Sequence, residues 1–496
     1  MAEYTREEIE AKLAEYAESL KTREEEEQKE AEKDAEEPAE EEEVDKEDHA
    51  EEPEDDSVEV LVEPAISLKG YDLSGLDLSD LDFYGIEMNE ANLEGANLSR
   101  SDLKKVNLAN AILKKANLSD CILEEADLTE ADLTEAILEE ANLQHGILTG
   151  ANLKGANLER ANMRQSKFIS ANLTGANLDH ADFERSDFSK AQLNDAKVTS
   201  AELARCKFNG ADLSGTDFTD SKLSMGVYFG TNFQKAVLVR AQIKGAKLSG
   251  ADFTGAQLPR ADLTSADLTE AKFINSDMKR SRLNGAILRR ALFQDSDLAE
   301  ANLNIADLTG AHLINVKLNG ADLGRIKLNE AKLEGASLSG ANLIGAKLGK
   351  VELTHADLSG ANLSGADMNE SNLEGSDLSR ATLSEASLEK ANLKNVFLIG
   401  ADLRSTNLRE INLEGADLSG AKMRKANFEK ANLRTANLRH SDLEHADFNG
   451  AFLNGANLQG AKLADALFTG ANLADADLSG ADTTDTDFTN ATGIAH

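Results

Sequence analysis

Few residues of this 496-residue chain could take part in catalysis or metal binding, and their spacing keeps most of them apart. Histidine, a common metal ligand and general base, occurs eight times, but only His440 and His445 lie close together. The two cysteines, Cys121 and Cys206, match neither a zinc site nor a disulfide framework. Phosphate-binding loops, nucleophile elbows and zinc motifs are absent from the sequence. We therefore expect a protein that is not an enzyme and that uses no metal or cofactor.

These cysteines and the two neighbouring histidines belong to a five-residue repeat, and their positions in the repeat indicate whether they lie in the core or on the surface. From Leu68 to Phe488 every fifth residue is apolar except Thr483, over 85 units without an insertion. The residue two positions earlier is Ala in 56 units and Ser, Cys, Gly or Thr in 18 more. Cys121 and Cys206 occupy this small position, so we expect them in the core. His440 and His445 fall at successive corners, which favours surface residues over a metal pair.

A period of five excludes an α-helix and predicts short extended segments joined by corners. Five residues advance a helix by ~500°, so the apolar residues would form no stripe. In an extended segment residues two apart face the same side, so Ala91 and Leu93 point inward and Asn92 outward. The two residues after each Leu must then turn the chain. Glycines such as Gly95, common at the second of them, suit a turn with positive φ.

Bulky residues reveal how many segments complete one coil, because large core side chains should stack on one another. They recur at steps of twenty residues in three series, which are Phe168, Phe188, Phe208 and Tyr228; Phe233, Phe253, Phe273 and Phe293; and Phe428, Phe448, Phe468 and Phe488. Twenty residues are four units, so the coil has four sides. The 85 units predict about 21 coils, and ~4.8 Å between stacked strands gives a column roughly 100 Å long.

The uninterrupted unit Ala-(Asp/Asn)-Leu-x-x over residues 66–490 resembles the pentapeptide-repeat family. The resemblance implies an all-β solenoid, a right-handed four-sided parallel β-helix. It also implies two settings known in that family, namely mimicry of DNA by proteins that bind DNA gyrase, and accessory or effector proteins of bacterial secretion systems. The fold alone does not choose between them.

The regions outside the repeat differ from it in charge. The formal net charge is −38, and residues 1–65 hold 29 Asp/Glu against 7 Lys/Arg. We expect an amphipathic, charged helix within residues 1–33, an acidic disordered linker over 34–57, a capping strand at 58–65 and a short tail at 491–496. The acid excess argues against direct nucleic-acid binding. The absence of a signal peptide or long apolar run predicts a cytoplasmic protein without membrane insertion, with signal-less secretion as an alternative.

The N-terminal helix carries one candidate binding face. Thr5 and Glu8 have the spacing of a capping box, and the apolar residues Ile9, Leu13, Tyr16 and Leu20 follow at helical spacing. Two interpretations are open, because this face could dock on a partner or fold back onto the solenoid. A homodimer through this helix or through a solenoid end is a further alternative.

A second candidate surface lies inside the repeat. Residues 221–250 contain five basic and no acidic residues, and apolar side chains occupy nominally outward positions, namely Met225, Val227, Phe229, Val237 and Val239. Such a band favours a protein partner, whereas a local kink or bulge that turns the side chains inward is the alternative.

The preferred hypothesis is a rigid, non-enzymatic scaffold that binds an unidentified protein. Gyrase mimicry and a secretion-system role are the alternatives.

Overall fold

The computed structural model describes residues 4–34 and 66–493. The chain forms two compact units, Met1–Lys167 and Phe168–His496. The expected capping strand at 58–65 and the expected linker, apart from Asp34, lie outside the described residues, as does the end of the C-terminal tail.

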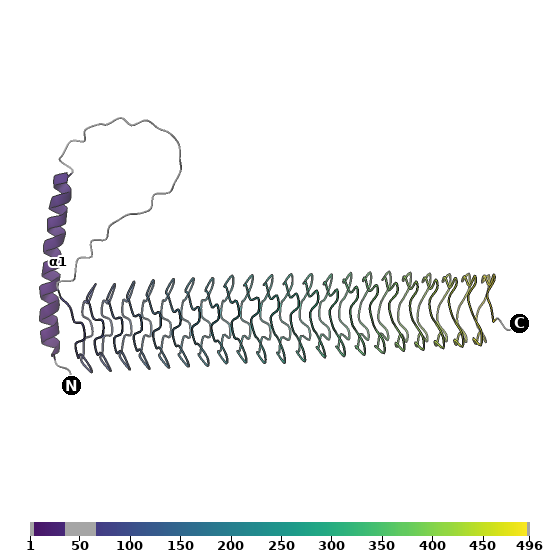
Figure 1. Cartoon of the computed structure of the whole chain (residues 1–496), viewed down its shortest axis with the longest axis horizontal. Coiled ribbons are helices and arrows are strands. Elements are labelled where there is room, and N and C mark those ends of the chain that lie inside the picture. Colours follow the sequence, from purple (N-terminus) through teal and green to yellow (C-terminus); the bar gives the residue numbers. More distant parts are fainter. Residues whose placement is uncertain (1–3, 35–65, 494–496) are drawn as a thin grey trace, which may run out of the picture. The chain divides into compact units, whose positions relative to one another are not determined.

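Both units are built from stacked four-sided coils (Figure 1). Each side contributes one bridging residue, and each bridge joins a residue in parallel to the residue twenty positions later. The bridges run from Ser67–Glu87 to Ile147–Lys167 in the first unit and from Asn172–Gln192 to Asn472–Thr492 in the second. The predicted four-sided parallel β-helix is therefore confirmed.

The core of each coil consists of the central apolar residue and the small residue before it. Nearly all of these side chains are fully buried, as for Leu93 and Ala91. All three predicted aromatic series stack within the second unit, for example with 4.6 Å between the ring centroids of Phe168 and Phe188 and of Phe233 and Phe253. Most polar residues at the small position donate to a backbone carbonyl, either of the preceding coil, as Thr216 does to Leu193 at 2.6 Å, or of their own coil, as Ser371 does to Met368 at 2.6 Å. The core therefore tolerates a hydroxyl wherever a backbone acceptor lies beside it.

The corners explain why Asp and Asn precede the central apolar residue. The side-chain oxygen of Asp72, for example, accepts a hydrogen bond from the backbone N–H of Ser74 at 3.1 Å, which closes the turn. The second corner residue has positive φ in every unit from Gly70 to Asn490. Most of these residues are not glycine, so the glycine rule derived from the sequence covers only part of the corners. The stacked neighbours hold such residues in the left-handed region despite its cost.

Helix α1 (Arg6–Asp34) lies across the open end of the first coil (Figure 1). It begins with the predicted capping box, in which Thr5 N–H donates to the Glu8 carboxylate at 2.7 Å and Glu8 N–H donates to the Thr5 hydroxyl at 3.3 Å. The Arg6 guanidinium donates to the carbonyls of Asp77 and Ser79 at 3.2 and 3.0 Å. These carbonyls face away from the next coil, so α1 satisfies polar groups that the end of a β-helix leaves unpaired.

The coil around Tyr228 departs from the usual core packing. Tyr228 is fully buried and its hydroxyl donates to the carbonyl of Leu223 at 3.1 Å. The small position of the same unit is Gly226, where a Cβ atom would lie 2.6–2.8 Å from the outer ring atoms and hydroxyl of Tyr228. The larger ring is therefore accommodated because its own unit lacks a side chain at the small position.

We expect Gly226→Ala to lower the free energy of unfolding by about 1–3 kcal/mol, because the new methyl group overpacks against Tyr228. Tyr228→Leu combined with Gly226→Ala recreates the usual Ala-x-Leu unit and should recover most of this loss. Urea unfolding of the two single variants and the double variant measures the coupling. Additive effects would contradict the proposed interdependence of the two residues.

Replacing Ile305 by Gly should stabilise the chain by about 1 kcal/mol, since a β-branched residue is held in the left-handed region at a cost of this size. Ile305 has φ 56° and is 56% exposed, so little buried surface is lost. Ile344→Gly is the matched control, because Ile344 occupies the first corner position and has no positive φ. The melting temperature should rise for the first variant and not for the second; a fall for both would refute the strain argument.

Ile9→Asp should release α1 from the first coil, because it places a carboxylate at a fully buried position. Hydrogen exchange should accelerate in residues 6–20 and in the coil of residues 66–85, and remain unchanged in the second unit. Ala11→Asp, on the exposed side of the same helix, is the control. Equal exchange in both variants would show that Ile9 does not anchor the helix.

Candidate protein-interaction surface

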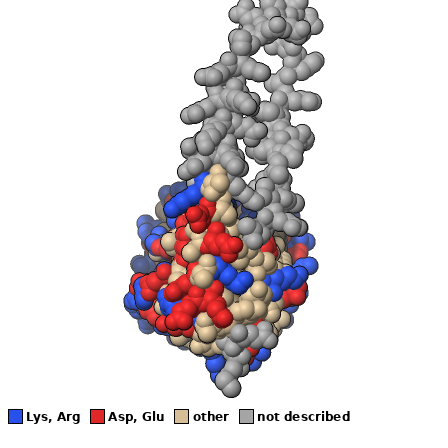
Figure 2. Space-filling view, turned by 90° about the vertical axis from the view of Figure 1, so that its left-hand side faces the viewer, with Lys and Arg blue, Asp and Glu red and all other residues tan. Residues whose placement is uncertain are grey.

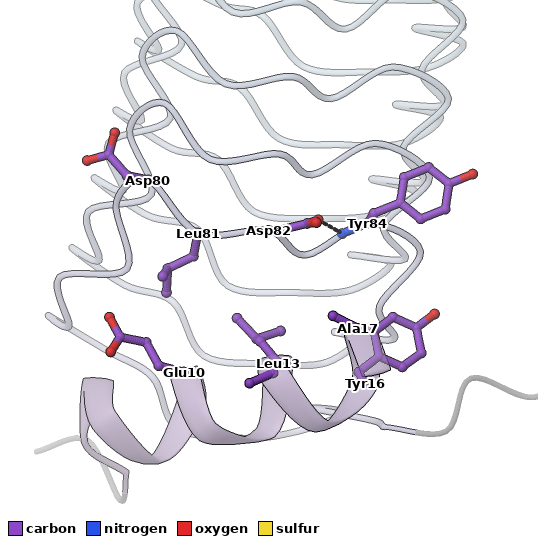
Figure 3. Close-up of a pocket in the computed structure, with 9 residues that line it drawn as sticks. Glu10, Leu13, Tyr16, Ala17, Asp80, Leu81, Asp82 and Tyr84 are labelled. Atoms are coloured by element: carbon purple, nitrogen blue, oxygen red, sulfur yellow. Dashed lines mark hydrogen bonds between the residues drawn. The ribbon is translucent and has the colours of Figure 1, made fainter. Parts of the chain in front are cut away.

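The first candidate surface is the contact between α1 and the first coil (Figure 3). A cavity of about 260 Å³ lies there, with Leu13 facing Leu81 across it and Tyr16 near Tyr84. The carboxylates at its edge already have partners, because Glu10 pairs with Arg6 at 2.6 Å and Asp80 with Arg100 at 2.6 Å. Acidic side chains also gather on the α1 end of this unit, with lysines and arginines among them (Figure 2).

The structure places the predicted helix residues mostly against the chain itself. Ile9 is fully buried and Leu13 is 9% exposed, while Tyr16 is half-buried with its hydroxyl beside Gly85. The side chain of Leu20 lies outside the described residues. The apolar stripe of α1 therefore covers the open end of the coil, and Ile9 and Leu13 are not free for a partner. Of the two interpretations of this helix face, the one in which it folds back onto the solenoid describes this arrangement.

The second candidate is the surface around Phe229. Met225 and Phe229 are 61% and 46% exposed, and Val227 between them is half-buried. The backbone keeps its regular pattern, because Val227 bridges to both Lys207 and Lys247 and its N–H donates to the Cys206 carbonyl at 2.9 Å. The alternative of a kink or bulge that turns these side chains inward is therefore wrong.

Local details show how the three apolar side chains are held outward. A Cβ atom on Gly245 would lie 2.7 Å from the Met225 sulfur, so Met225 extends over a corner that has no side chain. Val227 cannot accept the hydrogen bond that Asp or Asn normally accepts in this position. The Phe229 N–H donates instead to the Asn209 side chain of the preceding coil at 3.2 Å.

Basic residues predominate on the two adjacent sides of the coil that surround Phe229. The two adjacent sides formed by residues 201–210, 221–230 and 241–250 contain five basic residues and one acid. Glu202, the acid, pairs with Lys222, and Lys207 lies 3.7 Å from Asp187. Arg205, Lys244 and Lys247 have no ion pair among the residues that the structure describes. We define Met225, Val227 and Phe229 with Arg205, Lys207, Lys244 and Lys247 as the Phe229 surface.

Val237 and Val239 do not belong to this surface, which corrects the sequence prediction of one continuous band. A coil has four sides of five residues, so side chains ten residues apart in the sequence lie on opposite sides. Both valines are half-buried on the side opposite Val227 and Phe229. Proximity in the sequence had grouped residues that the coil separates.

Sequence reasoning missed a second aromatic surface in the same unit. Phe397 and Ile399 are 49% and 44% exposed, and Ile399 borders a shallow groove with Ser379 and Arg380. Phe397 stands where neighbouring coils carry Asp377 and Asp417, so a search for aromatics at the outward position would have found it.

The remaining reactive residues do not converge. Cys121 and Cys206 are buried, and burial raises the pKa of the Cys121 thiol to about 12 and that of Cys206 further still. His440 lies over Gly460, whereas His445 approaches Asp465 at 3.6 Å, so the two imidazoles engage separate corners. In residues 4–34 and 66–493, no group of three or more His, Cys, Asp or Glu side chains could hold a metal ion. Over the same ranges no helix is long and apolar enough to cross a bilayer.

Similar proteins of known structure include three repeat proteins. HetL, involved in heterocyst differentiation regulation in the cyanobacterium Nostoc sp. strain PCC 7120, is 31% identical over 52% of this chain and 92% of its own, with a TM-score of 0.19. Rfr23 from the cyanobacterium Cyanothece 51142 is 28% identical over 28% and 91%, with a TM-score of 0.14. QnrB1, a plasmid-mediated fluoroquinolone resistance protein, is 20% identical over 35% and 91%, with a TM-score of 0.18. A search of curated proteins gives no match.

These TM-scores are too low for the superpositions to support an argument, so the sequence matches carry the assignment. The family model described as Pentapeptide repeats (8 copies) matches successive segments from residue 72 to residue 493. Within that range it omits only residues 225–229, 396–397 and 435. The first two gaps coincide with the exposed Phe229 and Phe397. The chain belongs to the pentapeptide-repeat family, whose fold is the right-handed four-sided β-helix.

Proposed function

We propose that this protein is a non-enzymatic interaction scaffold that presents the Phe229 surface to a partner protein. The observation that supports the proposal is the exposure of Met225 and Phe229 on either side of Val227, within a stretch that the family model leaves unmatched although the coil register continues unbroken. Exposed apolar side chains beside unpaired cations are typical of protein-binding surfaces.

The fold does not require these three side chains, and Met225 works against it. Met225 is held at φ 61°, a region that is unfavourable for residues other than glycine. Val227 lacks the turn-closing oxygen that Asp or Asn supplies in many other units, and the Phe229 N–H donates to Asn209 of the preceding coil instead. Residues that lower stability at an exposed site are expected where function requires them.

DNA mimicry directed at gyrase is less well supported. A phosphate-like surface needs continuous negative charge, whereas five basic residues stand against one acid on the two sides around Phe229. Nothing among the described residues bears on a secretion-system role. A gyrase supercoiling assay with micromolar protein tests mimicry directly.

We expect Met225→Gly, Val227→Asn and Phe229→Ser together to abolish partner binding while leaving stability unchanged or higher. The triple variant restores the family pattern, including the closed turn and an unstrained corner. Affinity capture from the source organism with quantitative mass spectrometry should show at least one protein reduced about tenfold or more, which corresponds to a loss of ~1.4 kcal/mol.

The matched control is Val237→Asp with Val239→Ser, which restores the pattern on the opposite side of the same coils. This control should retain the partner. If the triple variant and the control capture the same proteins in the same amounts, the Phe229 surface is not the binding site.

A further inference from the structure

We propose that the Phe229 surface binds the acidic segment of residues 51–63 from a second copy of this chain. The inference rests on the proposed function and names the partner of that same surface. It predicts self-association in which one copy contributes the surface and the other contributes the segment.

The first argument is charge complementarity. Residues 51–63 contain seven acids and no base. The two sides of the coil around Phe229 carry five bases and one acid, and Arg205, Lys244 and Lys247 lack ion pairs among the described residues. The opposite two sides over residues 211–220 and 231–240 carry three acids and two bases. The attraction is therefore directed to one side of the coil.

The second argument is that both partners combine charge with apolar side chains. The segment contains Val58, Val60, Leu61 and Val62 directly after an acidic run. The surface offers Met225 and Phe229, whose exposed carbon atoms gain free energy when removed from water. Glycines at 210, 230 and 250 leave the corner around Phe229 without side chains, since a Cβ there would meet nothing within 4 Å. A peptide backbone can therefore approach Phe229 closely.

The third argument is that α1 occupies the place expected for this segment. The sequence predicted a capping strand at residues 58–65, next to the open end of the first coil. Arg6 already donates to the exposed carbonyls of Asp77 and Ser79, and Ile9 is buried at that end. These end carbonyls are therefore already paired by α1.

The length of the tether favours a second copy over the same chain. Val62 precedes Ile66, in the first coil, by four residues, which span at most ~14 Å. Residues 66–167 of the first unit make about five coils at twenty residues each, and stacked coils rise ~4.8 Å apiece, or ~24 Å in all. The four residues cannot carry Val62 beyond the coils of its own unit.

A peptide of residues 51–64 tests the contact directly. The probe is the fluorescein-labelled synthetic peptide, titrated with the full-length protein and followed by anisotropy. Phe229→Ser and Lys247→Glu should each weaken binding at least tenfold, as should a peptide in which Val60, Leu61 and Val62 are serine. Val239→Ser, on the opposite side, should leave binding unchanged. A labelled DNA duplex, titrated in parallel, should not bind.

A mixing experiment tests whether the contact forms between two copies. Analytical ultracentrifugation should show wild-type protein self-associating with concentration. A surface variant (Phe229→Ser with Lys247→Glu) and a segment variant (Val60→Ser, Leu61→Ser and Val62→Ser) should each remain monomeric. An equimolar mixture of the two should form a heterodimer, because each supplies what the other lacks.

Four results would overturn the inference: no peptide binding, peptide binding that is insensitive to Phe229→Ser, Phe229-dependent DNA binding in place of peptide binding, or a wild-type chain monomeric at ~100 μM. These failures are distinguishable from failure of the proposed function. If the peptide and mixing experiments fail while the triple variant still loses a captured protein, the surface binds a different partner. If capture is also unchanged, both proposals fall.

Discussion

The stacking of each residue on the residue twenty positions later is the interaction on which the rest of this structure depends. It pairs the backbone of each side with the next coil, as in the bridge between Asn92 and Ile112, and places like core side chains over one another. The core contains only an inward apolar residue and a small residue for each side. One large side chain therefore constrains its neighbours strongly, as Tyr228 shows by requiring Gly226. Inserting one residue into a side would shift the register of every later residue.

This constraint also decides what the corners can tolerate. Where Asp or Asn precedes the central residue, its side chain can close the corner within the unit, as in the bond from Ser74 to Asp72; at Phe229 the preceding coil supplies the acceptor instead. The neighbouring coils then hold the next residue at positive φ even when it is Ile305, which would avoid that conformation in isolation. Strain is distributed over many corners, and the hydrogen bonds between successive coils offset its cost in free energy.

Much of the fold could be predicted from the sequence because its signals are local and repeated. The twenty-residue step of the aromatic residues gave the number of sides, since only stacking explains it, and the stacked rings of Phe168 and Phe188 agree. Whether α1 docks on the solenoid or on a partner could not be predicted, because the spacing of Ile9 and Leu13 indicates an apolar face without indicating what covers it. The contacts of Arg6 with the end carbonyls depend on where the helix lies, which no local pattern records.

The candidate surface could be predicted only in part for a related reason. Composition indicated the exposure of Met225 and Phe229, but distance along the sequence does not describe distance around a four-sided coil, so Val237 and Val239 were grouped with them incorrectly. The coil geometry separates two kinds of position that composition treats alike. Inward positions are restricted by stacking, whereas outward positions are restricted only by the closed turn. A side chain such as Phe229 can therefore change without disturbing the register, and its presence requires an explanation outside the fold. In a β-helix of this kind, departures from the repeat at outward positions are the strongest structural indication of where a partner binds.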